Sequence, residues 1–307
     1  MRRHAVQISF LRPALACLLW AGMAGAAFAQ QDFSQVEIEV IPVADGVHML
    51  VGRGGNIGVS TGEDGVIVID DQFAPLHGKI VKAIASIRPD PIRFVLNTHW
   101  HGDHVGGNEA LSGLGAIVVA HDNVRERMSS EQFNALFDRR TPPSPEAALP
   151  VVTFGADVTL HLNGEEIHVF HVPKAHTDGD VLVHFRKADV LHTGDVFFAS
   201  GYPFIDRSSG GSINGLIVAV DRALDIAGPR TRIIPGHGPL SDEPGLTAYR
   251  GMLASVRDRV KAAMAGGKSL EALVAEKPLA DLDERWGGGF IDAPTLLRTV
   301  YESLAGS

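Results

Sequence analysis

The chain has almost no cysteine, and this scarcity limits its chemistry. Cys17 is the only cysteine among 307 residues, which excludes a disulfide framework, a cysteine zinc cluster and a thiol nucleophile further along the chain. Glycine and proline occur 34 and 17 times, without the excess that marks collagen-like or low-complexity chains. An apolar fraction of 45% over this length is typical of a globular protein that can bury a substantial core.

Basic charge is also scarce. The formal net charge is −9, and the sequence contains no stripe of lysine and arginine with interleaved aromatic residues. A protein this acidic repels phosphate backbones and anionic lipid surfaces. We therefore expect a small-molecule substrate and no nucleic-acid partner; the sequence does not indicate an oligomeric state.

The first 29 residues are typical of a signal peptide. Three arginines precede the uncharged run Ala14–Phe28. Residues 27–29 read Ala-Phe-Ala, the form that signal peptidase cleaves. The run is shorter than the roughly 20 apolar residues that span a bilayer. We predict cleavage after Ala29, export to the periplasm and no membrane association afterwards. Removing three positive charges from a net charge of −9 leaves a mature chain at −12.

Apolar periodicity predicts two successive sets of strands, each followed by helices. The first strands are expected at Val36–Ile41, Val47–Val51, Ile57–Ser60, Val66–Asp70, Phe94–Asn97 and Ile117–Ala120. The second set is expected at Val151–Phe154, Val158–Leu162, Glu165–Val172, Val181–Phe185, Val190–Thr193 and Arg232–Pro235. Helical spacing occurs over 76–87, 213–224 and 246–260. The pattern predicts a single α/β domain over residues 30–307 with four layers, αββα. The four prolines of Thr141–Pro150 favour a surface connection between the two halves.

Histidine is abundant, and its densest cluster points to a metal site. His99, His101, Asp103 and His104 occupy six residues directly after an expected strand. His99 and His101 can point the same way, whereas Asp103 and His104 point to different sides, so one turn could supply ligands to two adjacent ions. Imidazole and carboxylate ligands suit zinc, and also iron or manganese. Because such a cluster would repel itself without a cation, we predict metal binding.

The stretch His-x-His-x-Asp-His at 99–104 resembles the signature of the metallo-β-lactamase superfamily. Three further motifs of that family follow in order, each after an expected strand: Ala175-His176-Thr177, Thr193-Gly194-Asp195 and Pro235-Gly236-His237-Gly238. The resemblance covers roughly residues 36–240 and the helix after them. It implies the four-layer αββα sandwich of the metallo-β-lactamase fold and a zinc-dependent hydrolase.

The resemblance also implies a role for seven residues at two zinc ions. One ion would be bound by His99, His101 and His176, the other by Asp103, His104 and His237, and Asp195 would bridge both. Such a centre lowers the pKa of bound water from about 15.7 toward ~7, so that a metal-bound hydroxide can attack a carbonyl. Asp103 would be catalytic as well, by orienting the nucleophile or passing on its proton. His171 and His192 lie near these loops, and we expect neither to be a direct ligand.

The expected substrate follows from export and from one departure from the family pattern. Because β-lactams act in the periplasm, opening of the β-lactam ring is the leading expectation, and with it a role in antibiotic resistance. Many dedicated β-lactamases carry a cysteine where Asp195 stands and a lysine three residues later, where this chain has Phe198. Weak or promiscuous β-lactamase activity is therefore expected.

Two alternatives remain open. Asp195 resembles the bridging aspartate of the glyoxalase II-like branch, which implies a thioester or lactone hydrolase. The second alternative is a non-catalytic periplasmic metal-binding or redox-relay partner. An open coordination position would favour an enzyme, and a blocked one would favour a binder. The glycine-rich segment Trp286–Phe290 is a candidate wall of the pocket.

Overall fold

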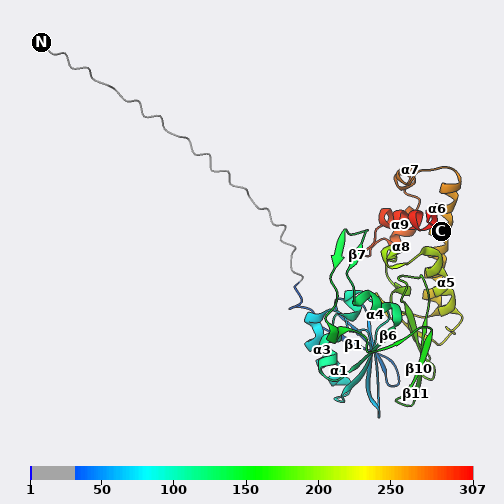
Figure 1. Ribbon diagram of the computed structural model, residues 1–307. Helices are drawn as coiled ribbons and strands as arrows, with labels where there is room; N and C mark the ends of the chain where they lie inside the picture. Colours follow the sequence, from blue (N-terminus) through cyan, green and yellow to red (C-terminus); the bar gives the residue numbers. More distant parts are fainter. Residues whose placement is uncertain (2–31, 307) are drawn as a thin grey trace. The chain divides into compact units, whose positions relative to one another are not determined.

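The computed structural model describes Met1 and residues 32–306, and the chain from Phe33 onward forms one compact unit (Figure 1). Apart from Met1, the predicted signal peptide at 1–29 lies outside the described residues, so cleavage and export stay predictions. Among the described helices, none combines the length and apolarity needed to cross a membrane.

The first sheet has seven strands in the order β1-β2-β3-β4-β5-β6-β9. Its strands are β1 (Glu39–Ala44), β2 (Val47–Val51), β3 (Ile57–Gly62), β4 (Gly65–Ile69), β5 (Ile92–Leu96), β6 (Ile117–His121) and β9 (Val152–Phe154). β1 to β4 are antiparallel neighbours, whereas β4, β5, β6 and β9 run parallel. The helices that follow its strands are α1 (His77–Ile87), α2 (Gly102–Val105), α3 (Asn108–Gly113) and α4 (Asp122–Met128).

The second sheet has five strands in sequence order, of which β13 and β14 are parallel. Its strands are β10 (Asp157–Leu162), β11 (Glu165–His171), β12 (Val181–Phe185), β13 (Val190–His192) and β14 (Arg232–Ile234). The later helices are α5 (Ile213–Leu224), α6 (Glu243–Ala265), α7 (Leu270–Ala275), α8 (Ala280–Trp286) and α9 (Ala293–Ala305). A separate hairpin, β7 (Gln132–Asn134) and β8 (Arg139–Thr141), rises beside the C-terminal helices (Figure 1).

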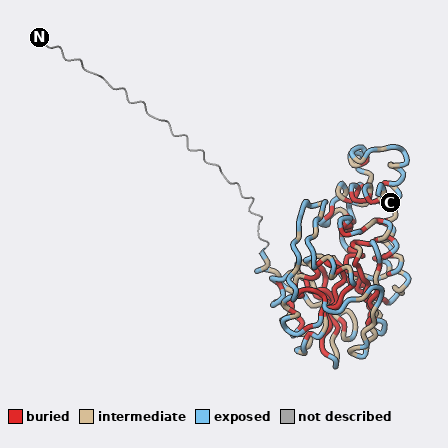
Figure 2. The backbone as a smooth tube through the Cα atoms, in the orientation of Figure 1, coloured by how far each residue is buried: buried red, intermediate tan, exposed pale blue. Residues whose placement is uncertain are grey.

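Side-chain alternation along the strands builds three apolar layers between the four layers of secondary structure. On β4, Ile67 and Ile69 face the second sheet and pack with its Val183, whereas Val66 and Val68 face the other way, toward α1 and α3. The far side of the second sheet is covered by α5, α6 and α9. Buried residues accordingly concentrate in the middle of the unit (Figure 2). The predicted αββα sandwich is confirmed.

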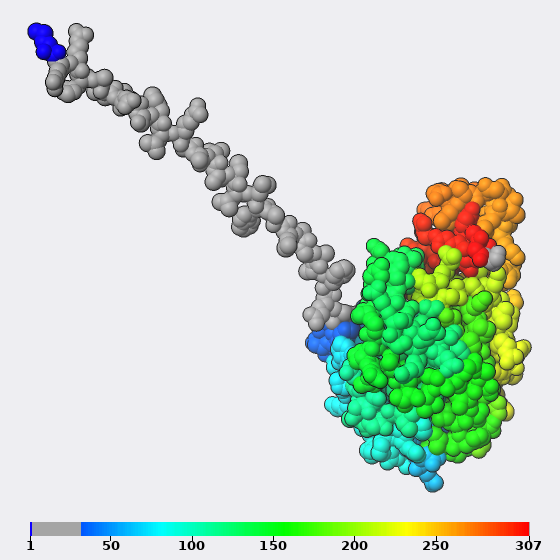
Figure 3. All heavy atoms as spheres, viewed as in Figure 1, coloured from blue at the N-terminus to red at the C-terminus, as the bar shows by residue number. Residues whose placement is uncertain are grey.

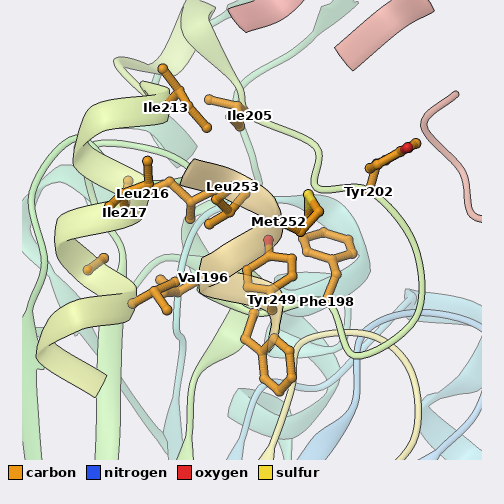
Figure 4. Packing of buried hydrophobic residues seen from close by; sticks show 14 of the residues in the cluster. Val196, Phe198, Tyr202, Ile205, Ile213, Leu216, Ile217, Tyr249, Met252 and Leu253 are labelled. Atoms are coloured by element: carbon orange, nitrogen blue, oxygen red, sulfur yellow. The ribbon is translucent and has the colours of Figure 1, made fainter. Parts of the chain in front are cut away.

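The helices on the second sheet begin where their sequences provide caps. Asp242 accepts a hydrogen bond from the amide of Gly245 at the start of α6, and Ser212 accepts one from Gly215 at the start of α5. The apolar faces that follow pack together, and Figure 4 shows Leu216 and Ile217 of α5 in one cluster with Val196, Tyr249 and Leu253.

The predicted division between the halves at Thr141–Pro150 is wrong. β9 follows these residues and still belongs to the first sheet, where Val152 pairs with Val119 of β6. Ala148 and Leu149 are buried, and Ala148 accepts a hydrogen bond from Asn108 through its carbonyl oxygen. The four prolines therefore mark an irregular connection inside the first half, and the chain passes to the second sheet only after Phe154.

Candidate metal centre

The seven residues predicted as ligands lie together at one edge of the two sheets. His99, His101, Asp103 and His104 follow β5, and His101 stands directly before the short helix α2. The remaining three come from the second sheet: His176 from the β11–β12 connection, Asp195 after β13 and His237 after β14. The parallel pairs β4–β5 and β13–β14 bring carboxyl ends of strands to the same place, as in other α/β sites.

Four of these residues form a tight, buried group. His101 Nδ1 lies 3.1 Å from His99 Nε2 and 2.8 Å from His176 Nε2. Asp195 Oδ2 lies 3.5 Å from His176 Nε2 and 3.8 Å from His99 Nε2. All four ligand atoms lie within 4.8 Å of one another. His99, His101, His176 and Asp195 therefore fit a divalent metal site.

A second group lies beside the first and consists of Asp103, His104 and His237. Asp103 Oδ2 lies 3.4 Å from His237 Nε2 and 3.9 Å from His104 Nε2. The other oxygen of Asp195, Oδ1, lies 3.1 Å from His104 Nε2 and 3.4 Å from His237 Nε2. Asp195 thus presents one oxygen to each group, the geometry that a bridging carboxylate needs.

Two orphaned atoms test whether these residues fit a cation. Within the described part of the chain, His104 Nε2 and Asp195 Oδ1 are buried and lie 3.1 Å apart, but they are not aligned for a hydrogen bond and neither has another partner, a state that is costly unless something else satisfies them. Two glycines keep the space around these atoms free. A Cβ at Gly236 would lie 2.1 Å from Asp195 Oδ1, and one at Gly55 would lie 2.1 Å from His104 Cε1. The residues fit a metal-binding centre.

The outer nitrogens of two histidines are held in place, which fixes which nitrogen faces the centre. His104 Nδ1 lies 2.7 Å from Asp70 Oδ2, and Asp70 also accepts hydrogen bonds of 2.7 Å from the amide and hydroxyl of Thr98. His176 Nδ1 donates to the carbonyl oxygen of Phe204 at 2.7 Å. Each ring therefore turns its Nε2 inward.

His101 is held by a longer network. Its Nε2 lies 3.0 Å from Asp206 Oδ2, and the Asp206 carboxylate accepts a hydrogen bond of 2.6 Å from the Ser209 hydroxyl. Trp100 Nε1 in turn donates to Ser209 Oγ at 3.1 Å. His101 consequently presents Nδ1 to the centre, unlike the other histidines of its group.

Sequence reasoning missed Asp70 and Asp206. Asp70 directly follows β4 and ends the strand predicted at Val66–Asp70, so its place at a strand's carboxyl end was a usable signal. Asp206 lies 105 residues from His101 in a loop, and no motif marks it.

Reciprocal charges strengthen the second group in the metal-free protein. Burial alone would lower the pKa of His104, but Asp195, Asp70 and Asp103 raise it well above its ordinary value. For His237, burial is likewise outweighed by Asp195 and Asp103, which raise the pKa to about 9. Burial would raise the pKa of Asp103, yet His104 and His237 lower it to about 2. The Asp103 carboxylate is therefore ionised at neutral pH.

The first group is different, because two of its histidines, His99 and His176, are neutral. Burial, together with the charge on His104, lowers the pKa of His99 well below its ordinary value. Burial also lowers the pKa of His176. Neutral imidazole is the form that binds a metal ion, so these rings are ready to act as ligands.

The neighbouring histidines support the loops. His192 Nε2 contacts the carbonyl oxygen of Asn56 at 3.2 Å, and His192 Nδ1 accepts a hydrogen bond of 3.2 Å from the amide of Gly194. His171 contacts the carbonyl oxygen of Asp178 and stacks on His121. Neither lies in a ligand group of the described residues.

The centre is open on one side. The side chains of Asp103 and His237 are 28% and 29% exposed, and that of His101 is 14% exposed, whereas His104 and His176 are fully buried. Solvent or a small molecule can therefore approach the side formed by Asp103 and His237.

Part of the chain is similar in sequence to relatives named hydroxyacylglutathione hydrolase. A hydroxyacylglutathione hydrolase of Pelagibacter ubique is 30% identical over 111 residues, covering 36% of this chain and 38% of the relative. The hydroxyacylglutathione hydrolase of Polaromonas sp. (strain JS666) is 28% identical over 195 residues, covering 60% and 66%. The chain thus matches less than two thirds of the length of either relative.

The fold itself is shared with solved structures. A metallo-beta-lactamase from Pontibacter korlensis superposes with a TM-score of 0.58 at 20% sequence identity, covering 71% of this chain and 99% of that one. Residues 50–239 match the profile of the metallo-beta-lactamase superfamily, and this stretch contains all seven ligand candidates and most of both sheets. The chain belongs to the metallo-beta-lactamase superfamily.

Proposed function

We propose that the protein is a metal-dependent hydrolase of acyl compounds, with thioesters as the preferred substrates. The observation that carries the proposal is the split of the Asp195 carboxylate between two ligand groups, at a centre that is open beside Asp103 and His237. Relatives named hydroxyacylglutathione hydrolase support an acyl group joined to a thiol as the substrate.

In this proposal the centre binds two zinc ions, with iron or manganese as alternative metals. The first group would hold one ion and the second group the other. Divalent cations at such a centre lower the pKa of water and polarise a carbonyl oxygen. That chemistry needs no cysteine or serine nucleophile, in agreement with the single cysteine at residue 17.

Asp103 has a role beyond binding in this proposal. Its carboxylate is partly exposed on the open side, and its low pKa of about 2 keeps it ionised. An ionised carboxylate there can accept a hydrogen bond from the attacking water and fix its orientation. A carboxyl group with this pKa is a weak base, so orientation is the larger part of its contribution.

β-Lactam hydrolysis is the second candidate. Phe198, which stands where dedicated enzymes of this family carry a lysine, is buried and stacks on His237 with ring centroids 5.1 Å apart. It also packs in the cluster around Tyr249 and Met252 (Figure 4). Arg207, which follows Asp206 and is another cation that could bind such a carboxylate, pairs with Glu302 at 2.7 Å. These contacts favour at most weak binding of a β-lactam carboxylate, and any role in antibiotic resistance depends on this activity.

The non-catalytic alternative is less favoured. A metal-binding or redox-relay partner would be favoured by a blocked coordination site, whereas Asp103 and His237 are accessible here. A small-molecule substrate explains that opening.

One panel of substrates tests the proposal. The purified zinc-loaded protein is assayed with acyl thioesters, lactones, penicillins and carbapenems, each with and without a chelator. We expect chelator-sensitive turnover, highest for thioesters. A kcat/KM for β-lactams above that for thioesters would reverse the order of the candidates, and no turnover of any compound would leave the metal-binding partner.

Export is a separate part of the proposal. We propose that the chain is cleaved after Ala29 and works in the periplasm, because its first residues have the form of a signal peptide. Mass spectrometry of a periplasmic fraction should find Gln30 as the first residue. Intact chain beginning at Met1 in the membrane fraction would mean that the segment is an anchor.

A further inference from the structure

Three phenylalanine rings form a row that leads from the metal centre to the surface. Phe204 stacks on the ring of His101, with centroids 5.6 Å apart and an interplanar angle of 28°. Phe137, at the tip of the β7–β8 hairpin, lies 5.3 Å from Phe204, and Phe290 lies 5.5 Å from Phe137. The row thus joins a candidate ligand to two rings at the surface.

Phe137 is held in place by polar contacts of the hairpin tip. Asn134 Oδ1 accepts hydrogen bonds from the amides of Leu136 and Phe137 at 3.1 and 3.2 Å. The tip is tied to the loop beside the centre by a 3.0 Å hydrogen bond from the Ala135 amide to Ser208 Oγ. The ring of Phe137 is therefore fixed beside Phe204 by its own turn and by the segment that carries Asp206.

Phe290 is held by the backbone on both sides. Ile291 is buried and forms an isolated bridge with Tyr202, two residues before Phe204. Gly289 packs so closely on Gly201 that a Cβ at position 289 would lie 3.0 Å from the Gly201 Cα. The segment Trp286–Phe290, predicted as a candidate wall, is thus anchored to the chain that leads to Phe204, through contacts that place Phe290 on the surface.

The two outer rings are more exposed than packing alone requires. Phe290 is 77% exposed and Phe137 is 43% exposed. Burial of an aromatic ring is one of the largest apolar contributions that a side chain can make to the stability of a fold, and these two rings largely forgo it. They come from distant segments, the hairpin and the loop after α8, which meet beside each other (Figures 1 and 3). A cavity of about 520 Å³ lies beside Phe204; Phe137 and Phe290 are not part of its lining, which includes apolar Leu136 as well as polar residues of α9 such as Arg298.

We propose that Phe204, Phe137 and Phe290 bind the apolar acyl group of the substrate, a medium-length alkyl chain or an aromatic ring attached to the scissile carbonyl. This inference rests on the proposed hydrolase function and names its substrate class. Asp103 and His237 are the most exposed of the seven candidate ligands, so in this inference the leaving group departs beside them. The acyl group then lies along the row, which begins where Phe204 contacts His101 and His176.

Binding of straight-chain carboxylates tests the row without any turnover. The zinc-loaded protein is titrated calorimetrically with acetate, butyrate, hexanoate and octanoate, in which the carboxylate stands for the carbonyl end. A fully buried methylene contributes about fourfold to affinity, and on this partly open surface we expect about twofold for each. Octanoate should then bind roughly 60-fold more tightly than acetate, an estimate from that per-methylene value.

The variants are Phe137→Ala with Phe290→Ala, and Phe133→Ala as a matched control. Phe133 lies on the same hairpin and is also 43% exposed, but its ring contacts Arg140. The double variant should bind octanoate less than about fivefold more tightly than acetate, since it loses most of the apolar surface. The control should keep the parental dependence on chain length.

Three results would overturn the inference: an affinity independent of chain length, a double variant that keeps the parental dependence, or a control that loses it equally. The last would indicate non-specific adsorption to exposed rings. Hydrolysis is measured separately with acetyl and octanoyl thioesters. The two experiments can fail separately. If neither thioester is hydrolysed but carboxylate affinity still rises with chain length and needs Phe137 and Phe290, the proposed function is refuted and the apolar binding row remains.

Discussion

The two ligand groups differ in burial and in charge. His99 and His176 of the first group are enclosed, and burial lowers the pKa of each ring. In the second group, Asp103 and His237 are more than a quarter exposed, and opposite charges hold the pKa of Asp103 near 2 and that of His237 near 9. The first group is suited to hold an ion and the second to meet a substrate.

The contacts that orient the ligand rings also differ between the two groups. Asp206 and the carbonyl oxygen of Phe204 fix two rings of the first group. In the second group, Asp70 fixes His104, whereas His237 stacks on Phe198. Three predictions test whether holding and reacting are separate tasks of the two groups, and a fourth tests a buried histidine outside them.

The largest effect is expected at Asp103. Asp103→Asn keeps an oxygen ligand but removes the negative charge that orients water, so kcat should fall by at least about 10²-fold, the cost of a misplaced reacting group. The zinc content should change much less. Parental turnover in this variant would show that Asp103 is only a replaceable ligand.

The second prediction compares the groups through metal content. Protein from zinc-supplied cells should carry close to two equivalents of zinc, because one tetrahedral ion takes about four ligands and this centre has seven candidates. His237→Ala should lose one equivalent and keep the ion of the first group. Elemental analysis that finds one equivalent in both proteins would reject the assignment of two sites.

The third prediction concerns the support of the first group. Asp206→Ala removes the carboxylate that orients His101, so zinc affinity should fall about 10–100-fold in a chelator competition. Asp221→Ala, which removes a carboxylate paired with Arg250 on the surface, is the control. Equal affinities in the two variants would show that His101 needs no such support.

The smallest effect is expected at His192, a buried histidine outside both groups. The unfolded chain protonates this residue near pH 6.5, but burial lowers its pKa in the folded chain to about 4. Between these values the unfolded state binds more protons, so acid destabilises the fold. From pH 7.5 to 5.5 the loss is about 1 kcal/mol. Urea unfolding should show a weaker pH dependence in His192→Gln, and an identical slope would mean that His192 does not contribute.

Most strands were predictable because their signals are local. β2 and β12 have the predicted bounds, and α5 spans the predicted helix. β1 begins at Glu39, three residues later than expected. The β7–β8 hairpin, α7 and α8 are too short to show a clear period. Sequence reasoning missed α9, although Leu296, Leu297 and Val300 form a buried face on it.

The sequence by itself determined the identity of the seven candidate ligands. Four of them lie within six residues, so local geometry alone brings them together, and the motifs around His176, Asp195 and His237 follow strands in a recognisable order. A metal-binding site of this kind can be recognised from residue types and their spacing, because both can be read without knowledge of the fold.

Only the tertiary structure decided how these ligands are divided, supported and approached. The orientation of Asp195 between the groups, the partners Asp70 and Asp206, and the meeting of Phe137 with Phe290 depend on segments that are far apart in the chain. No local signal marks such contacts, because a lone aspartate or phenylalanine acquires its role from the packing of the two sheets and of the elements at their common edge.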